Sequence, residues 1–554
     1  MAGRLVAAGH SVLLIEAGGS APKLVHVPGM VGNLQRGAVD WAYKTEEQEG
    51  AGRSGGGVSR WPRGRALGGS SLLNYMLYVR GNSRDYDAWG ELGLEGWSWK
   101  EVLPYFKRTE KWGGEHDVGP KHGKDGDLWV EESRYTDAVV DAFLESASEL
   151  NMTVGDINGD QEDGGFTVSQ VTTKKGWRAG AFETFAAKHE GLGLTVMRHT
   201  MASKLLFEGK RVVGVEVERF GRREEVFASG EVVVSAGAIG SPHLLLLSGV
   251  GDASHLAEVG VPLVHHLPDV GQNLQDHLMS PIAIDVNSGA ALDILAGLSP
   301  FEIFNYFWHG TGPLASPGGC GGLAHFHSEN SNSSAPDLQL HIISVSFATD
   351  FGAIYGHNMN TEELAFEYVQ PHLGGASASI IPTLNRPKSR GSIKLRDSSP
   401  YSHPIIDPRY LTEEEDVTAL ISGLKFGRKV AESEPFSRIG AEIWDRKYDP
   451  YCGGLRNKEE EYWRCYVRTW SFTVYHPVAT CSMGKVTDER LRVVGLEGVR
   501  VVDASVMPII PGGNTQAPTM MIAERAADWI LEEGKAKQPR TGFEKDDCGQ
   551  KEEL

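Results

Sequence analysis

A short apolar run followed at once by an acidic residue lies close to the start of this chain. Ser11 to Ile15 (SVLLI) is typical of a buried parallel strand, and Glu16 stands at its carboxyl end. In a dinucleotide-binding unit, an acidic residue at this place binds the ribose hydroxyls of the nucleotide. The pattern therefore predicts a doubly wound α/β domain in which Glu16 faces a nucleotide.

Such a unit normally begins with a first strand, a G-x-G-x-x-G turn and a helix, which place backbone amides around the pyrophosphate. Because only fifteen residues precede Glu16, we expect Met1 to Gly9 to supply no more than the end of that helix. The absent strand would be the central one of the sheet, and each buried group left unpaired costs roughly 1 to 3 kcal/mol. We therefore expect this sequence to be an incomplete version of a longer protein, which folds and holds its nucleotide poorly.

Two glycine-containing segments predict a close approach of backbone to a flat ligand. In Arg63 to Trp89, the glycines 64, 68 and 69 stand among serines and small apolar residues. Gly237 to Gly251 directly follows an apolar run that is typical of a buried strand. Glycine lets backbone contact a ligand without a side chain in between.

The carboxy-terminal fifth of the chain contains a histidine and an asparagine in two neighbouring segments. His476 precedes Pro477, whose ring favours an extended backbone at the histidine. Asn514 lies in a Pro/Gly-rich approach to a predicted helix that has Pro518 in its first turn. The amino end of such a helix stabilises an anion. A histidine before proline is also common in turns, and an asparagine before a helix is a common cap.

Taken together, these segments resemble the glucose-methanol-choline (GMC) family of FAD-dependent oxidoreductases. The two glycine-containing segments are similar to the family's two signature patterns, and the segments around His476 and Asn514 are similar to its catalytic region. The resemblance runs from Ser11 to Ile530 with the motifs in the family's order. The family's amino-terminal glycine fingerprint is missing.

Within the family, two segments look most like the glucose dehydrogenase (FAD, quinone) branch of arthropods. They are SSLLNYMLYVRGNSRDYDAW (Ser70 to Trp89) and SRGSIKLRDSSP (Ser389 to Pro400). Leu73 stands where some choline-oxidising members carry the histidine that bonds FAD covalently, so the resemblance implies non-covalent FAD.

The resemblance also implies individual roles in cofactor binding. Glu16 would hold the adenosine ribose, Trp41 would lie beside the adenine, and Met201 would meet the adenine through its backbone. Each has a structural alternative: Glu16 a strand-end charge, Trp41 a core residue, the glycines turns, and Asp503 a helix cap. The full set is Glu16, Trp41, Leu67, Gly68, Gly69, Ser70, Asn74, Met76, Leu77, Met201, Ala236, Gly237, Asp503, Ala504 and Thr515.

The predicted reaction is oxidation of a CH–OH group of a sugar or other alcohol by hydride transfer to flavin. Since hydride leaves carbon readily only when the hydroxyl loses its proton in step, a base is required, and we assign His476 to that role. Asn514 would donate a hydrogen bond to the developing alkoxide. Quinone, a dye or oxygen would accept the electrons. The alternatives are a truncated, catalytically silent isoform and a non-redox flavin protein of the lyase type.

Composition excludes several other classes. The net charge of −19 repels nucleic acid and anionic membrane, and no run of about 18 apolar residues predicts a membrane span. The five cysteines show no metal-binding spacing, so no metal is expected. In an extracellular protein, Cys452 and Cys465 could close a short disulfide loop, and the alternative is five ordinary thiols. Secretion is favoured if a missing amino-terminal segment carries a signal peptide.

We expect an α/β FAD-binding (Rossmann-like, discontinuous) domain and an α+β substrate domain with an antiparallel sheet. The FAD-binding domain is assigned residues 1–112, 189–277 and 486–533, and is incomplete at its amino terminus. The substrate-binding domain is assigned residues 113–188 and 278–485, and residues 534–554 are predicted to form a disordered tail.

Overall fold

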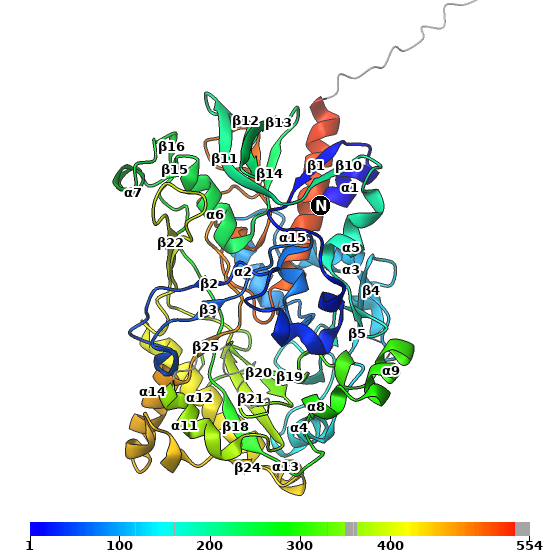
Figure 1. Cartoon of the computed structure of the whole chain (residues 1–554), viewed down its shortest axis with the longest axis vertical. Coiled ribbons are helices and arrows are strands. Elements are labelled where there is room, and N and C mark those ends of the chain that lie inside the picture. Colours follow the sequence, from blue (N-terminus) through cyan, green and yellow to red (C-terminus); the bar gives the residue numbers. More distant parts are fainter. Residues whose placement is uncertain are drawn as a thin grey trace, which may run out of the picture.

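The chain folds into two regions, which lie one above the other in Figure 1. The computed structural model describes residues 1–116, 118–159, 161–329, 331–349, 358, 360 and 363–537. The upper region contains short parallel strands and the long helix α15 (Gln516–Lys537), and the lower region contains a large antiparallel sheet. The predicted combination of an α/β and an α+β domain is confirmed.

Two parallel strand pairs form the centre of the upper region. β1 (Val12–Ile15) pairs with β10 (Leu194–Met197), and β14 (Val232–Val234) pairs with β26 (Val499–Val501). Within the described ranges no strand joins the two pairs, and residues of both β1 and β14 line one cavity. A gap that belongs to this cavity therefore separates β1 from β14, and we call it the strand slot.

The other elements of the upper region pack around these pairs. The first nine residues contain one short helix, α1 (Ala2–Ala7), as expected from the sequence, and it lies against β1 and α15. A three-stranded antiparallel sheet stands at the top of Figure 1, and α6 leaves directly from β14. The bounds are α1 (Ala2–Ala7), β11 (Thr200–Glu208), β12 (Arg211–Arg219), β13 (Arg222–Phe227), α6 (Gly237–Leu247), α2 (Ser83–Glu91) and α3 (Trp99–Thr109).

The lower region is built on an eight-stranded sheet, in which β24, β18, β21, β20, β19 and β6 are neighbours in that order. β17 adds to β21 and carries β25 on its other edge. Helices α12 and α4 pack on this sheet and bury its apolar side chains. The bounds are β24 (Glu442–Ile443), β18 (Ile282–Asp285), β21 (Ser377–Leu384), β20 (Leu338–Ile343), β19 (Cys320–Phe326), β6 (Gly165–Val168), β17 (Leu278–Met279), β25 (Phe472–Thr473), α12 (Glu414–Ala431) and α4 (Ala138–Glu149).

Shorter elements complete the described fold. They are β2 (Tyr43–Lys44), β3 (Arg60–Trp61), β4 (Glu110–Trp112), β5 (Leu128–Glu132), β7 (Gln170–Val171), β8 (Thr173–Lys174), β9 (Trp177–Arg178), β15 (Val250–Gly251), β16 (His265–His266), β22 (Ser392–Lys394), β23 (Ile405–Asp407), α5 (Ala181–Phe185), α7 (Ala253–Glu258), α8 (Ile294–Gly297), α9 (Pro300–His309), α11 (Glu363–Val369), α13 (Glu434–Arg438) and α14 (Glu459–Thr469).

Two predictions about the carboxy-terminal part have clear outcomes. Cys452 and Cys465 form a disulfide, so the predicted pairing is confirmed. The disordered tail predicted for residues 534–554 is wrong for residues 534–537, because α15 continues to Lys537. Residues 538–554 lie outside the described residues.

In the part of the chain that the structure describes, no helix has the length and apolar character needed to cross a bilayer.

If the strand slot is open, backbone amides that face it should exchange their hydrogens rapidly with solvent. Val12 and Glu16 donate their amides toward β10, so alternation along β1 points the amides of Leu13 and Ile15 into the slot. We expect these two amides to exchange much faster than that of Leu340, which lies in a strand with partners on both sides. Equal protection at Leu13 and Leu340, measured by NMR or mass spectrometry, would contradict an open slot.

Candidate active site

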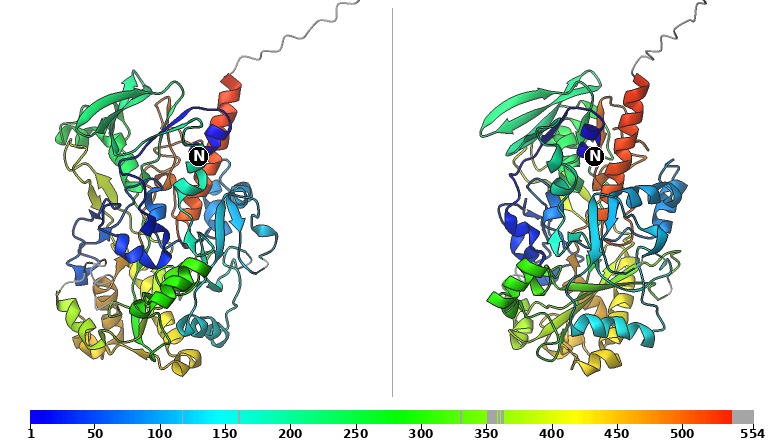
Figure 2. Two further views of the ribbon diagram at one scale, coloured as in Figure 1. Left: turned by 45° about the vertical axis from the view of Figure 1, so that its right-hand side comes forward. Right: turned by 90° about the vertical axis from the view of Figure 1, so that its right-hand side faces the viewer.

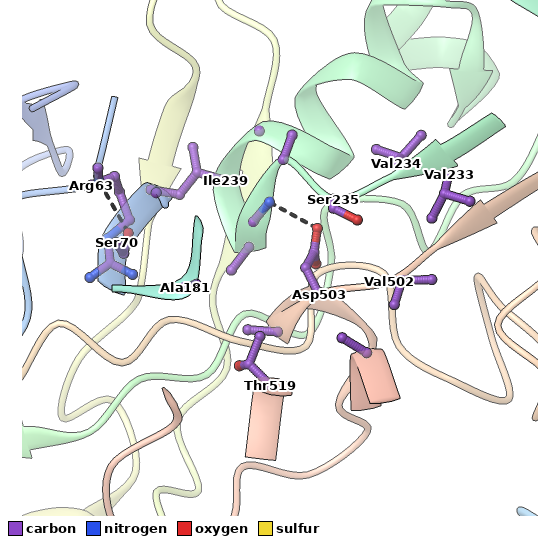
Figure 3. A pocket seen from close by; sticks show the side chains of 18 of the residues that line it. Arg63, Ser70, Ala181, Val233, Val234, Ser235, Ile239, Val502, Asp503 and Thr519 are labelled. Atoms are coloured by element: carbon purple, nitrogen blue, oxygen red, sulfur yellow. Dashed lines mark hydrogen bonds between the residues drawn. The ribbon is translucent and has the colours of Figure 1, made fainter. Parts of the chain in front are cut away.

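One cavity of about 2340 Å³ runs from the strand slot to the antiparallel sheet. Ordinary small-molecule pockets measure about 300–1,000 Å³, so this cavity has room for a dinucleotide and a second molecule. Figure 3 shows one part of it, where Asp503 points from the end of β26 toward α6 and Thr519 of α15 lies nearby. The cavity therefore joins the two regions of the fold.

The structure brings most of the predicted site residues to this cavity. Both predicted catalytic residues line it, and so do fourteen of the fifteen predicted cofactor residues. The exception is Leu67, which is buried behind the wall and donates its amide to the carbonyl of Gly19. Leu67 thus supports the wall of the cavity without facing it, and its role in cofactor binding stays a prediction.

The glycine turn before Asn74 presents bare backbone to the cavity. Gly68 and Gly69 have φ angles of +108° and +55°, which side-chain-bearing residues rarely adopt. A Cβ on Gly64 would lie 2.1 Å from the carbonyl of Gly69, whereas a Cβ on Gly69 would meet no atom within 4 Å. Gly64 is thus needed for packing, and Gly69 leaves open space where a ligand can approach.

Two acidic residues of the cavity wall are held by backbone amides. Glu16 Oε1 accepts a hydrogen bond of 2.7 Å from Gly18 N, and burial raises the pKa of Glu16. Asp503 accepts hydrogen bonds of 2.8 Å from Gly237 N and from Ser505 N. Asp503 thus caps the short 3-10 helix Ala504–Val506 through Ser505 N, which is the structural alternative considered for it, and it also holds the amide of Gly237 and lines the cavity.

His476 lies at the end of a line of hydrogen bonds that starts at a backbone carbonyl. The carbonyl oxygen of Asn385 lies 3.1 Å from His277 Nε2, and His277 Nδ1 lies 3.0 Å from His476 Nδ1. On the other side of the ring, His476 Nε2 lies 3.2 Å from Asn514 Nδ2. The two catalytic residues predicted from distant segments are therefore in direct contact.

This line of contacts fixes which nitrogen of each ring carries the proton. A carbonyl can only accept, so His277 Nε2 donates, and the neutral His277 ring then accepts at Nδ1. His476 must donate from Nδ1, which leaves its Nε2 with a lone pair that accepts from the amide of Asn514. The unprotonated nitrogen of His476 thus faces Asn514, at the cavity wall.

Burial also sets the charge state of this pair. Desolvation lowers the pKa of His277 to about 3 and lowers the pKa of His476 well below its ordinary value, with neighbouring His277 adding to the second effect. A lowered pKa means that the ring loses its proton at a lower pH. His476 therefore remains the neutral, proton-accepting form at neutral pH and in mildly acidic solution.

The backbone of His476 is held by a residue that sequence reasoning missed. Asp276 accepts hydrogen bonds from His476 N at 2.8 Å and from Thr473 Oγ1 at 2.6 Å. Burial raises the pKa of Asp276 to about 6. Asp276 and His277 were missed because their partners lie some 200 residues away in sequence. Two adjacent titratable residues just before an apolar run were the available signal.

A second missed residue is Arg178, which is buried without a carboxylate partner. Its Nε donates to the carbonyl of Val25 at 2.7 Å, and its Nη1 donates to Asn74 Oδ1 at 2.7 Å. Its Nη2 has no partner in the described structure, and burial lowers the pKa of Arg178 to about 9. Asn74 in turn donates to Gln516 at the start of α15, so this cation is linked to the cavity wall.

These features define a buried histidine–asparagine pair beside a large cavity, and comparison with known proteins identifies the family. Sequence models described as GMC oxidoreductase match residues 12–279 and 387–523. The protein belongs to the GMC oxidoreductase family, and its cofactor is FAD.

Individual relatives cover nearly the whole chain. It is 35% identical to glucose dehydrogenase [FAD, quinone] of Drosophila melanogaster over 96% of this chain and 84% of that protein. It is also 35% identical to the mitochondrial choline dehydrogenase of Homo sapiens over 96% of this chain and 87% of that protein. Among solved structures, pyridoxine 4-oxidase from Mesorbium loti has a TM-score of 0.79 at 27% identity, with 96% of each chain covered.

The residues present fit FAD. Gly69 and Gly237 face open space at the cavity, and the first turn of α15 and the cation Arg178 suit an anionic cofactor. Two buried polar atoms of the lining, Asn514 Oδ1 and His341 Nε2, have no partner among the described residues. Buried polar atoms of this kind mark positions for a ligand.

A substitution at Gly69 tests the cofactor site. Gly69→Ala places a methyl group in the cavity, so we expect FAD affinity to fall at least tenfold by equilibrium dialysis with flavin absorbance. Gly93→Ala is the matched control, because Gly93 also has a positive φ angle, of +83°, and open space around it but does not line the cavity. Equal FAD affinity in both variants would argue against FAD at Gly69.

Proposed function

We propose that this protein oxidises the CH–OH group of a neutral alcohol or sugar, with His476 as the general base and non-covalently bound FAD as hydride acceptor. The observation that carries the proposal is the unprotonated Nε2 of a buried, neutral His476 held beside the amide of Asn514 at the cavity. Removal of a hydroxyl proton requires a base that accepts the proton and, at the same place, a hydrogen-bond donor that stabilises the oxygen.

In this mechanism, the substrate hydroxyl donates its proton to His476 Nε2. The amide of Asn514 donates a hydrogen bond to the same oxygen as negative charge develops on it. Bound FAD supplies the acceptor for the hydride that leaves the substrate carbon. His277 keeps the proton of His476 on Nδ1, so that Nε2 is ready to accept.

Asp276 and Arg63 position the base. Asp276 holds the amide of His476, and Arg63 Nη2 donates to the carbonyl of Tyr475 at 2.6 Å. Tyr475 has a φ angle of +65°, which a tyrosine adopts only when its surroundings hold it there. These contacts fix the direction in which the imidazole faces the cavity.

The substrate end of the cavity favours a neutral substrate. Its described lining from the antiparallel sheet and the adjoining loops is apolar or uncharged, with no carboxylate, and includes Met279, Ile343, Val345, Phe347 and Ile381. A quaternary ammonium substrate such as choline would lack a counter-charge there. Glucose or another neutral alcohol is therefore the better candidate, with quinone, a dye or oxygen as electron acceptor.

Two other functions are a catalytically silent flavin protein and a non-redox flavin protein of the lyase type. Both would leave the absorbance of bound flavin unchanged on addition of an alcohol. Bleaching of that absorbance under anaerobic conditions, in a screen of sugars, alcohols and choline, separates them from the proposed oxidoreductase.

Substitutions at the proposed pair give distinct expectations. His476→Ala should abolish flavin reduction by alcohol while FAD remains bound, because the variant lacks the proposed base. Asn514→Ala should slow reduction by about 10² to 10³-fold, as for other donors to a developing oxyanion. Stopped-flow absorbance under anaerobic conditions measures both rates. An unchanged rate in His476→Ala would refute the assignment of the base.

A further inference from the structure

A group of exposed apolar side chains lies on α8 and α9. Phe301 and Trp308 are 72% and 74% exposed, and Phe304 and Phe307 are 59% and 62% exposed. Leu295 of α8 adds a side chain that is 71% exposed. Figures 1 and 2 show α9 on the outside of the molecule. We call these five side chains the aromatic patch.

Helix α9 exposes aromatic side chains to solvent and turns its polar side chains toward the protein, unlike an ordinary surface helix. Its less exposed side chains include Glu302 and Asn305, which contact each other at 3.4 Å, while Tyr306 is buried and donates to the carbonyl of Gly176. Phenylalanine and tryptophan occupy the solvent side. A soluble protein ordinarily places its polar side chains outward, so an outward aromatic face indicates a surface that is covered in use.

The carboxyl end of α9 carries positive charge beside the aromatic patch. Arg134 Nε donates to the carbonyl of Gly310 at 3.0 Å, but its Nη1 lies 3.8 Å from Glu131, so this cation is paired with a carboxylate. The exposed Lys175, whose backbone lies against Gly310, is the cation at this edge that faces solvent. His309, in the last turn, is also exposed. Aromatic side chains that project outward with cations at one edge match the headgroup boundary of a phospholipid bilayer.

We propose that the aromatic patch docks the protein on the surface of a phospholipid bilayer, with α9 lying in the membrane interface. Phe301, Phe304 and Trp308 enter the acyl boundary, and Lys175 remains at the level of the phosphates. This attachment is peripheral, which agrees with the lack of a spanning helix among the described residues. The inference does not depend on the proposed reaction.

The overall charge bears on the kind of bilayer. A net charge of −19 repels strongly anionic surfaces, while the cations at the end of α9 act only locally. The aromatic side chains must therefore supply most of the attachment. Binding to uncharged phosphatidylcholine vesicles should thus occur, and it should persist in high salt.

The test is flotation of the full-length, FAD-loaded chain with phosphatidylcholine vesicles. The triple variant Phe301→Ser, Phe304→Ser and Trp308→Ser should lose at least tenfold in partition to vesicles. The control is Leu192→Ser with Phe220→Ser, which removes side chains that are 75% and 78% exposed but lie elsewhere. This control should partition like the original chain, and all three proteins should retain flavin absorbance.

Two results would overturn the proposal. One is equal flotation of the original chain and the triple variant. The other is an original chain that does not bind vesicles but sediments as a dimer, together with a triple variant that sediments as a monomer, because the aromatic patch would then be an interface between copies.

A variant at Lys175 tests the placement of α9. Lys175→Glu should reduce binding to vesicles that contain phosphatidylserine more than binding to vesicles of phosphatidylcholine alone, and an equal effect on both would contradict that placement.

Discussion

The active site depends on one buried contact, the hydrogen bond between the two imidazole rings of His277 and His476. In a protein interior, a donor that faces a donor is costly, so a line of partners that begins at a carbonyl allows one arrangement of protons. Here that arrangement leaves the lone pair of His476 on the nitrogen that contacts Asn514. Burial keeps both rings neutral, so the arrangement holds over a wide range of pH.

The contact also explains why the site lies where the two regions meet. His277 directly precedes β17 of the antiparallel sheet, and His476 follows β25, which pairs with β17. Asn514 comes from the approach to α15 in the upper region. The imidazole of His476 is thus fixed by the rigid sheet, and Asn514 is placed by the helix whose first turn faces the cofactor cavity.

Local patterns were enough to predict much of this arrangement. Glu16 follows a strand and Gly69 lies in a glycine turn, and both face the cavity because their positions depend on local backbone geometry. The burial of Leu67 behind the cavity wall could not be predicted, because a turn does not reveal which of its side chains face a cavity. The partners of His476 could not be predicted, since His277 and Asp276 reach it only through the pairing of β17 with β25. The outward face of α9 was likewise hidden, because helical periodicity does not say which side of a helix faces solvent.

The proton positions of this imidazole pair are the most direct test of the account. Neutron crystallography of the FAD-loaded protein at neutral pH should show a hydrogen isotope on Nδ1 of His476 and none on its Nε2. A proton on Nε2 of His476 in the oxidised, substrate-free protein would contradict the account, because that nitrogen would have no lone pair with which to accept a proton from the substrate.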